Sequence, residues 1–149
     1  MPDMGVFPVH AAAIKVGKTG INSAAEDMVT IAEMESAEVA IEGNSEEWTP
    51  LDTGGWGNSE ITGKRIKITM AGKRCPGDPG NDYIAGLSLK VGAACNTKVE
   101  IDYPNGDKLE LLVSVNVTAL AGGESTNIAK LEIEMSSKGA PTYTPHVAA

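Results

Sequence analysis

The stretch TKVEIDYPNGDKLELLVSVNVTALAGGESTNIAKLEIEMSS, residues 97–137, decides the fold class of this chain. Apolar and polar residues alternate with a period of two at 97–103, 108–119 and 128–137, which is typical of antiparallel strands with one buried and one solvated face. The residues expected to point inward are Val99, Ile101, Tyr103, Leu109, Leu111, Val113, Val115, Val117, Leu131, Ile133 and Met135. Asn105-Gly106 predicts a type I′ hairpin turn, because both residues tolerate a positive φ.

Further segments towards the N-terminus fit the β pattern. Residues 11–16 form a first candidate strand, and residues 65–70 alternate again. Between residues 29 and 41 the alternation is imperfect, since Glu33 and Glu35 interrupt it, so this segment predicts one bent strand or two. The 17 glycines and few aromatic residues also favour short elements joined by tight turns. A chain of 149 residues is expected to form one domain, residues 1–149.

One segment, Asn81–Val91, predicts an α-helix. Asn81 fits the N-cap position and Gly92 fits the stop position. The residues at i, i+3, i+4 and i+7 spacing are Ile84, Leu87, Ser88 and Val91. The predicted fold is therefore mainly β, with two packed antiparallel sheets (a sandwich or open barrel) flanked by one helix.

Residues 42–63 show no period and are predicted to form a long inter-strand loop. Both tryptophans, Trp48 and Trp56, lie in this segment among Gly, Pro and charged residues. Loops of about 20 residues are uncommon in compact domains unless they have a function. Two tryptophans on a polar loop indicate that at least one contacts a partner. Residues 1–10 and 139–149 contain proline and lack a period, so they are expected to be extended arms.

The chain is acidic, with a formal net charge of −8 at pH 7. A cationic clamp for nucleic acid is therefore not expected, and the acidic surface fits a soluble protein or a wall that repels a polyanion. The sequence shows neither an export signal nor an apolar run of about 18 residues, so no membrane partner is expected. Cys75 and Cys95 are expected to be free thiols in a reducing cytoplasm, although a disulfide between them stays open.

No motif in the chain predicts catalysis. Residues 16–19 end like a phosphate-binding loop, but Ala12 stands where the first glycine is needed and no helix is predicted to follow. The two histidines and two cysteines lack the spacing of a catalytic or zinc site, and nothing selects a pair of carboxylates for acid/base chemistry. We expect no enzyme activity, metal or cofactor. Residues 77–82 are explained by a turn and a helix cap.

The order of short motifs nevertheless resembles a known family. Residues 48–56 read W-T-P-L-D-x-x-G-W, residues 62–68 read T-G-K-x-[apolar]-x-I, and residues 72–83 read G-K-R-x-x-G-D-P-G-N-D-Y. Further matches are Tyr103-Pro104-Asn105-Gly106, Val115-Asn116-Val117-Thr118, Leu131-Glu132 and Gly139-Ala140-Pro141-Thr142. In number and order, and over nearly the whole chain, these motifs are similar to the major tail tube protein of long-tailed, non-contractile bacteriophages, the siphophage tail tube family.

The resemblance implies a structural virion protein of the phage tail, assembled in the host bacterial cytoplasm. In that family, hexameric rings stack into a hollow tube around a tape-measure protein, and DNA is later ejected through the tube. The implied partners are other copies of the chain, the tape-measure protein, the tail terminator and the tail tip proteins, while genome DNA passes without specific binding. Relatives can carry an extra immunoglobulin-like domain, for which we expect no room after Pro141.

On this interpretation three sets of residues receive roles. The ring-stacking candidates are Trp48, Leu51 and Trp56. The lumen-facing candidates are Glu110, Glu132 and Glu134, on strand faces expected to be acidic and exposed. The candidates for a turn that seats a neighbouring subunit are Asp78 and Asn81.

Two alternatives stay open at this stage. One is the tube protein of a related secretion or injection machine, which would use the same ring stacking. The other belongs to a different class, a monomeric β-sandwich that binds carbohydrate, with Trp48 and Trp56 as stacking platforms for sugar rings.

Overall fold

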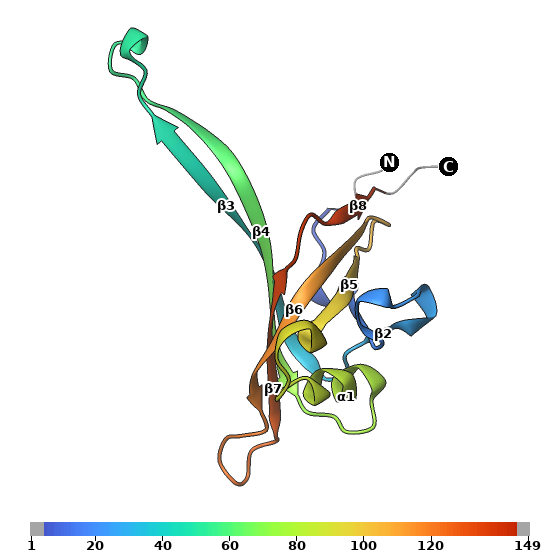
Figure 1. Ribbon diagram of the computed structural model, residues 1–149. Helices are drawn as coiled ribbons and strands as arrows, with labels where there is room; N and C mark the ends of the chain where they lie inside the picture. Colours follow the sequence, from blue (N-terminus) through green and yellow to red (C-terminus); the bar gives the residue numbers. More distant parts are fainter. Residues whose placement is uncertain (1–4, 146–149) are drawn as a thin grey trace.

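The computed structural model describes residues 5–145, and within this range the chain is mainly β (Figure 1). The strands are β1 (Ala13–Gly17), β2 (Met28–Thr30), β3 (Met34–Trp48), β4 (Asn58–Lys73), β5 (Asn96–Asp102), β6 (Lys108–Leu120), β7 (Lys130–Ser137) and β8 (Thr142–Thr144). The single α-helix of the described range is α1 (Pro79–Gly86), and short 3-10 turns are η1 (Val9–Ala11), η2 (Gly20–Asn22), η3 (Ala25–Asp27), η4 (Leu51–Thr53) and η5 (Gly92–Cys95). No helix in this range is long and apolar enough to cross a membrane.

All eight strands belong to one antiparallel sheet, in the order β2-β1-β5-β6-β7-β4-β3, with β8 beside β6. β6 belongs to both halves of the sheet. Its first half pairs with β5 and β8, and its second half pairs with β7. The two layers expected from the sequence are therefore the two halves of one continuous sheet. The predicted β-sandwich-like fold with a single helix is confirmed.

The core consists of the alternating apolar residues that the sequence places inward. Val99, Ile101, Leu109, Leu111, Val113, Val115, Leu131, Ile133 and Met135 are buried, together with Ile66, Ile68 and Met70 from β4. Tyr103 and Val117 are half-buried at its margin. Ile84 of α1 and the following Leu87 pack into the same cluster, so the helix closes one end of the core (Figure 1).

The helix starts earlier than the sequence predicts, and Asn81 is not its N-cap. Asp78 takes that position, and its carboxylate accepts a hydrogen bond from the Asn81 amide at 2.9 Å. Pro79 follows directly, where its fixed φ suits the first helical turn. The helix ends at Gly86, with Leu87 as its C-cap, so the predicted last turn to Val91 is wrong and the Val91 side chain is exposed.

The segment 29–41 forms two strands, one of the two options that its pattern left open. β2 pairs with β1, whereas β3 pairs with β4. Glu33 lies between them with a φ of 63°, and its carbonyl accepts a hydrogen bond from the Lys73 amide at 2.8 Å. The Glu33 carbonyl lies so close to Gly72 that a Cβ on Gly72 would be 2.2 Å from the carbonyl oxygen. Glu33 thus interrupts the alternation because the chain turns there.

The largest difference concerns residues 42–63, which were expected to form a loop. They form the outer part of a hairpin between β3 and β4, paired up to Trp48 and Asn58, and only residues 49–57 form the connection. Both faces of this hairpin are exposed, so neither face is selected for apolar residues and no period of two develops. A strand that buries neither face cannot be recognised from alternation.

The turn between β5 and β6 also differs from the prediction. Gly106 has a φ of 97°, but Asn105 is not among the residues with positive φ, so the turn is not of type I′. Instead the Asn105 side chain accepts a hydrogen bond from the Asp107 amide at 3.0 Å. The hairpin itself is confirmed, and a hydrogen bond from the Tyr103 amide to the Asp107 carbonyl closes its end.

The two terminal arms are described only in part. Residues 5–8 have no regular structure, and residues 1–4 and 146–149 lie outside the described range. Within the predicted C-terminal arm, β8 pairs with the start of β6, and the Tyr143 hydroxyl donates to the Asp107 carboxylate at 2.6 Å. Part of this arm is therefore attached to the sheet.

Candidate functional site

The outer β3–β4 hairpin stands away from the body of the molecule (Figure 1). β4 pairs with β7 only from Lys67 onwards, so β3 is the only strand in the described range that pairs with residues 58–65. At a rise of about 3.3 Å per residue, this part alone extends about 25 Å. Residues 41–65 are all exposed except Pro50, which is half-buried. Because an isolated two-stranded hairpin is only marginally stable in water, contact with another molecule would stabilise this element.

The tip of the hairpin brings the three predicted stacking residues together. Leu51 is 104% exposed, Trp56 is 79% exposed and Trp48 is 43% exposed. The connection between the strands is nevertheless ordered, because the Thr53 hydroxyl lies 2.9 Å from the Pro50 carbonyl and 2.8 Å from the Trp56 carbonyl. Large apolar side chains at the end of a defined arm indicate a contact surface for another molecule.

The tip is also acidic. Between residues 43 and 63 the chain contains Glu46, Glu47, Asp52 and Glu60 but no Lys or Arg. Glu46 and Glu60 are direct cross-strand neighbours, an arrangement that is unfavourable for two like charges. A partner that supplies cations would relieve this repulsion. We define the hairpin tip as residues 46–60.

The three lumen-facing candidates lie on the sheet face opposite the core. Glu134 forms an ion pair with Lys67 at 3.0 Å, and this hydrogen bond and the carboxylate charge raise the pKa of Lys67 above its usual value. Glu110 lies 4.0 Å from Lys98. Glu132 lies between Ala71 and Ala119 of the neighbouring strands. The structure therefore places all three on one face, two of them beside a lysine.

This polar sheet face is not acidic, in contrast to the prediction. The strand register and the Lys73–Glu35 ion pair place bases and acids on it in nearly equal number: Lys15, Arg65, Lys67, Lys73, Lys98, Lys108 and Lys130 with Glu35, Glu38, Glu42, Glu100, Asp102, Glu110, Glu132 and Glu134. Lysines bridge neighbouring strands, as in the Lys108–Glu100 pair at 3.2 Å, where the hydrogen bond that Lys108 donates to Glu100 raises the pKa of Lys108. Most of the net charge of −8 therefore belongs to the rest of the molecule.

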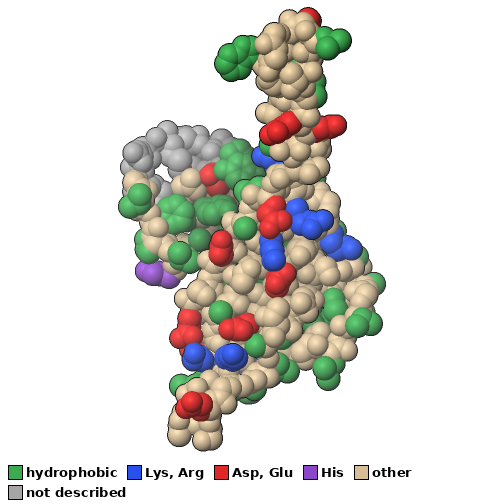
Figure 2. Space-filling model, turned by 90° about the vertical axis from the view of Figure 1, so that its left-hand side faces the viewer, with side chains coloured by type: hydrophobic (Ala, Val, Ile, Leu, Met, Phe, Trp, Pro, Cys, Tyr) green, Lys and Arg blue, Asp and Glu red, His purple; other side chains and the backbone are tan. Residues whose placement is uncertain are grey.

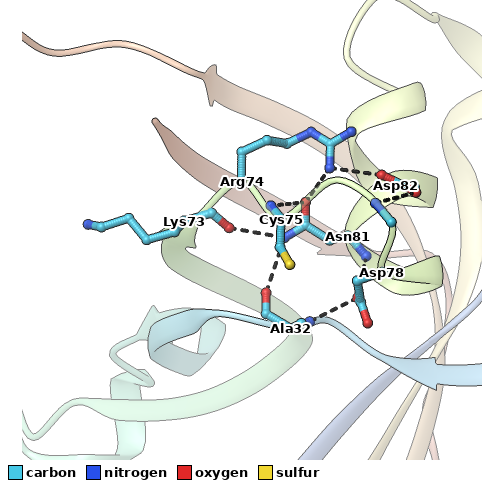
Figure 3. Close-up of polar contacts among 8 residues, drawn as sticks. Ala32, Lys73, Arg74, Cys75, Asp78, Asn81 and Asp82 are labelled. Carbon is cyan, nitrogen blue, oxygen red and sulfur yellow. Dashed lines mark hydrogen bonds and ion pairs between the residues drawn. The ribbon is translucent and has the colours of Figure 1, made fainter. Parts of the chain in front are cut away.

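The turn before α1 forms an internal polar network (Figure 3). Asn81 is fully buried, and its amide oxygen accepts from the Arg74 guanidinium at 2.8 Å and from the Cys75 amide at 3.0 Å. Its amide nitrogen donates to the carbonyls of Ala32 and Lys73. The Asp78 carboxylate also accepts from the Ala32 amide at 3.1 Å. The network ties α1 to the end of β4 and to the corner between β2 and β3.

This geometry supports the turn-and-cap explanation of residues 77–82. All hydrogen-bonding positions of the Asn81 side chain are used inside the chain, so Asn81 has none left for a neighbouring subunit. The seating of a neighbour by this turn stays a prediction, and it would have to involve exposed neighbours of the network such as Gly77 and Asp82.

The remaining motifs have structural roles. Gly17-Lys18-Thr19 lies at the end of β1, where the Gly17 carbonyl accepts from the buried Thr97 hydroxyl at 2.6 Å. Cys75 and Cys95 are free thiols, and the Cys95 thiol donates to the Lys90 carbonyl. Among the described residues no cluster of His, Cys, Asp or Glu could hold a metal ion.

Comparison with known proteins finds no matching family model and no matching curated protein. Among solved structures, the chain is similar to one in the tail of an empty gene transfer agent particle, computed with C6 symmetry. The TM-score is 0.75 at 18% identity, covering 94% of this chain and 100% of that chain. A chain in the virion of the native gene transfer agent gives a TM-score of 0.68 at 18% identity, with coverage of 94% and 100%.

A more distant similarity connects the chain to an injection machine. A chain in the sheath-tube complex of an extracellular contractile injection system gives a TM-score of 0.61 at 14% identity, covering 95% of this chain and 93% of that one. At these identities the similarity concerns the fold. The chain thus has a phage-tail-tube-like fold, while the narrower resemblance to the siphophage family stays a prediction.

Proposed function

We propose that the protein is a tail tube subunit that assembles with copies of itself into hexameric rings, which stack into a hollow tube. The observation that carries the proposal is the exposed hairpin, whose tip is both apolar and acidic. The similarity in fold to a chain of a tail with C6 symmetry supports it. Its role would be structural, with no reaction catalysed. The tube would belong to a virion tail, assembled in the bacterial cytoplasm, with the tape-measure, terminator and tail tip proteins as partners.

Ring formation follows from the open sheet. β2 and β3 are the ends of the strand order, and β3 presents an unpaired edge along a strand of 15 residues. Long free edges invite pairing with another chain, and joining the edges of neighbouring subunits around a ring would remove them. A head-to-tail contact of this kind closes when its rotation divides the circle, and the closed rings can then stack.

Stacking is assigned to the hairpin. Trp48, Leu51 and Trp56 lie far from the core of their own subunit and would be buried against the next ring. Aromatic residues buried at the centre of an interface typically contribute about 2 kcal/mol or more each. The lumen would be lined by the polar sheet face with Glu110, Glu132 and Glu134. A face with nearly equal numbers of bases and acids neither concentrates phosphate nor repels it strongly, so DNA could slide along it without specific binding.

The test is the assembly state of the purified protein. Light scattering should show hexamers or larger species, and negatively stained images should show sixfold rings and tubes. A protein that stays monomeric at high concentration, with or without a tape-measure protein, would exclude the proposal. It would instead favour the monomeric carbohydrate-binding alternative, for which Trp48 lines an open hollow of about 540 Å³ at the tip.

A tube protein of an injection machine is the second candidate, favoured by the similarity to the sheath-tube complex. Both candidates predict rings and tubes, so assembly alone does not separate them. Electron microscopy of particles isolated from the producing cells would separate the two candidates, because a virion tail is attached to a DNA-filled capsid and an injection machine is not.

A further inference from the structure

An open apolar groove lies at the base of the hairpin, between the hairpin and the segment that leads into β8. Its volume is about 730 Å³, within the range of pockets that bind bulky groups. The apolar residues that line it are Ile41, Ile66, Tyr103, Leu109, Pro141 and Tyr143. Figure 2 shows hydrophobic side chains gathered beside the base of the projecting arm.

The groove exists because the sheet opens at this point. β7 leaves β4 at Lys67, and β8 pairs with β6 but with no other strand of the described range. Two backbone edges therefore border the groove, one on the outer part of β4 and one on β8. Such edges can accept hydrogen bonds from a further segment of chain.

The charge at the mouth of the groove is positive. Lys64 is exposed and has the same parity in β4 as the groove residue Ile66, so it points to the groove side of the hairpin. Arg65 also borders the groove, but its parity points its side chain to the polar sheet face. Within residues 5–145 neither side chain forms an ion pair, whereas most lysines of the polar sheet face do. The groove thus combines an apolar floor with an unpaired cation, Lys64.

The hairpin tip has the complementary chemistry. It carries Trp48, Leu51 and Trp56 beside four acidic side chains and no base. It cannot occupy the groove of its own chain, because the extended strands hold it about 25 Å away from the base. A tip that fits the groove must therefore come from a second copy.

We propose that this groove receives the hairpin tip of a second copy, with the apolar side chains on the groove floor and the acidic ones against Lys64. The proposal rests on the proposed function, in which the second copy is a subunit of an adjacent ring. Every subunit then donates one tip and offers one groove. Such a head-to-tail contact does not close on itself along the axis, so it repeats from ring to ring.

The first test is a charge exchange in the full-length protein. Lys64→Glu and Asp52→Lys should each reduce tube formation at least about tenfold, because like charges would meet at the contact. The double variant Lys64→Glu/Asp52→Lys should restore it. Lys90→Glu is the matched control, since Lys90 is also exposed and lies away from the groove, and it should assemble normally. Circular dichroism checks that each variant is folded.

The second test locates the contact directly. A photoreactive amino acid in place of Leu51 should crosslink, in wild-type-like tubes, to Tyr103, Pro141 or Tyr143 of another copy. Crosslinks to a different surface, no rescue in the double variant, or an equal loss with Lys90→Glu would each overturn the groove assignment. If rings and tubes form and depend on Leu51 but not on Lys64, the groove proposal fails while the proposed function stands. If the wild-type protein forms no tubes, the proposed function fails first.

Discussion

At the scale of single residues, the structure separates side chains that maintain the fold from those available for assembly. Asn81 and Leu51 represent the two groups, since Asn81 is fully buried and Leu51 is fully exposed. Both lie in motifs that carry the resemblance to tail tube proteins, so the motif alone does not distinguish their roles. The burial and the hydrogen bonds of each side chain distinguish the two roles.

Asn81→Ala is predicted to destabilise the subunit by about 2–4 kcal/mol, because the Ala32 and Lys73 carbonyls and the Arg74 guanidinium lose a buried partner. Urea unfolding of the monomer measures the change. Asn116→Ala is the matched control on the exposed face of β6, and it should cost no more than about 0.5 kcal/mol. Equal stability of the two variants would contradict the role of the network.

Trp56→Ala, Trp48→Ala and Leu51→Ala should stop tube growth while leaving the subunit folded, because each removes apolar area that only a partner covers. Leu89→Ala is a close control for Leu51→Ala, since Leu89 is 95% exposed and lies outside the hairpin. Electron microscopy of assembled samples and thermal unfolding of the monomers give the two readouts. Normal tubes from all the hairpin variants would remove the hairpin from ring stacking.

At the scale of elements, the success of prediction from sequence follows from burial. The strands of 97–137 are correctly predicted because each has one face in the core, and a buried face forces alternation. The hairpin was missed because neither of its faces is buried in the subunit, so its order comes from strand pairing alone. The sequence still singles out Trp48 and Trp56 as candidates, because tryptophans among polar residues are a signal of contact that does not depend on secondary structure.

The helix start and the charge of the sheet face show what sequence cannot supply. Asp78 and Asn81 both suit an N-cap, and only the corner between β2 and β3 decides between them by taking the Asn81 side chain. Glu132 and Glu134 suggest an acidic face when β7 is viewed alone. The balance of charge emerges only from the register, which brings Lys67 beside Glu134 and Lys98 beside Glu110.

The attachment of β8 gives a prediction for pH. The hydrogen bond from the Tyr143 hydroxyl to Asp107 raises the pKa of Tyr143 above its usual value of 10.0. The bond needs the protonated hydroxyl, so its contribution is complete below pH 10 and is lost as the pH rises through the raised pKa. Tyrosinate absorbance should show one late-titrating tyrosine that is missing in Tyr143→Phe. If the tyrosine that the variant lacks titrates in the wild type at the usual pKa, β8 is detached in solution.

At the scale of the whole molecule, charge is divided between surfaces with different proposed neighbours. The polar sheet face is nearly balanced, whereas the hairpin tip is acidic and the groove at its base carries the unpaired cation Lys64. In a stacked tube, tip and groove would compensate each other along the axis. The balanced face would remain free to meet whatever passes through the lumen.

Replacing both Glu132 and Glu134 with Lys tests whether the balanced face lines the lumen. The fold should survive, because substitutions at solvated positions typically cost about 0.5 kcal/mol, although Lys67 loses its partner. The face would become strongly cationic in every subunit of every ring, and cationic rings retain phosphate through counterion release, an effect that weakens as salt rises. DNA ejection from assembled particles should therefore slow at low salt and recover at high salt. Glu26→Lys/Glu124→Lys makes the same charge change at exposed positions off this face, and it should leave ejection unchanged. Normal ejection at low salt, from tubes shown to contain the first variant, would place these glutamates away from the lumen.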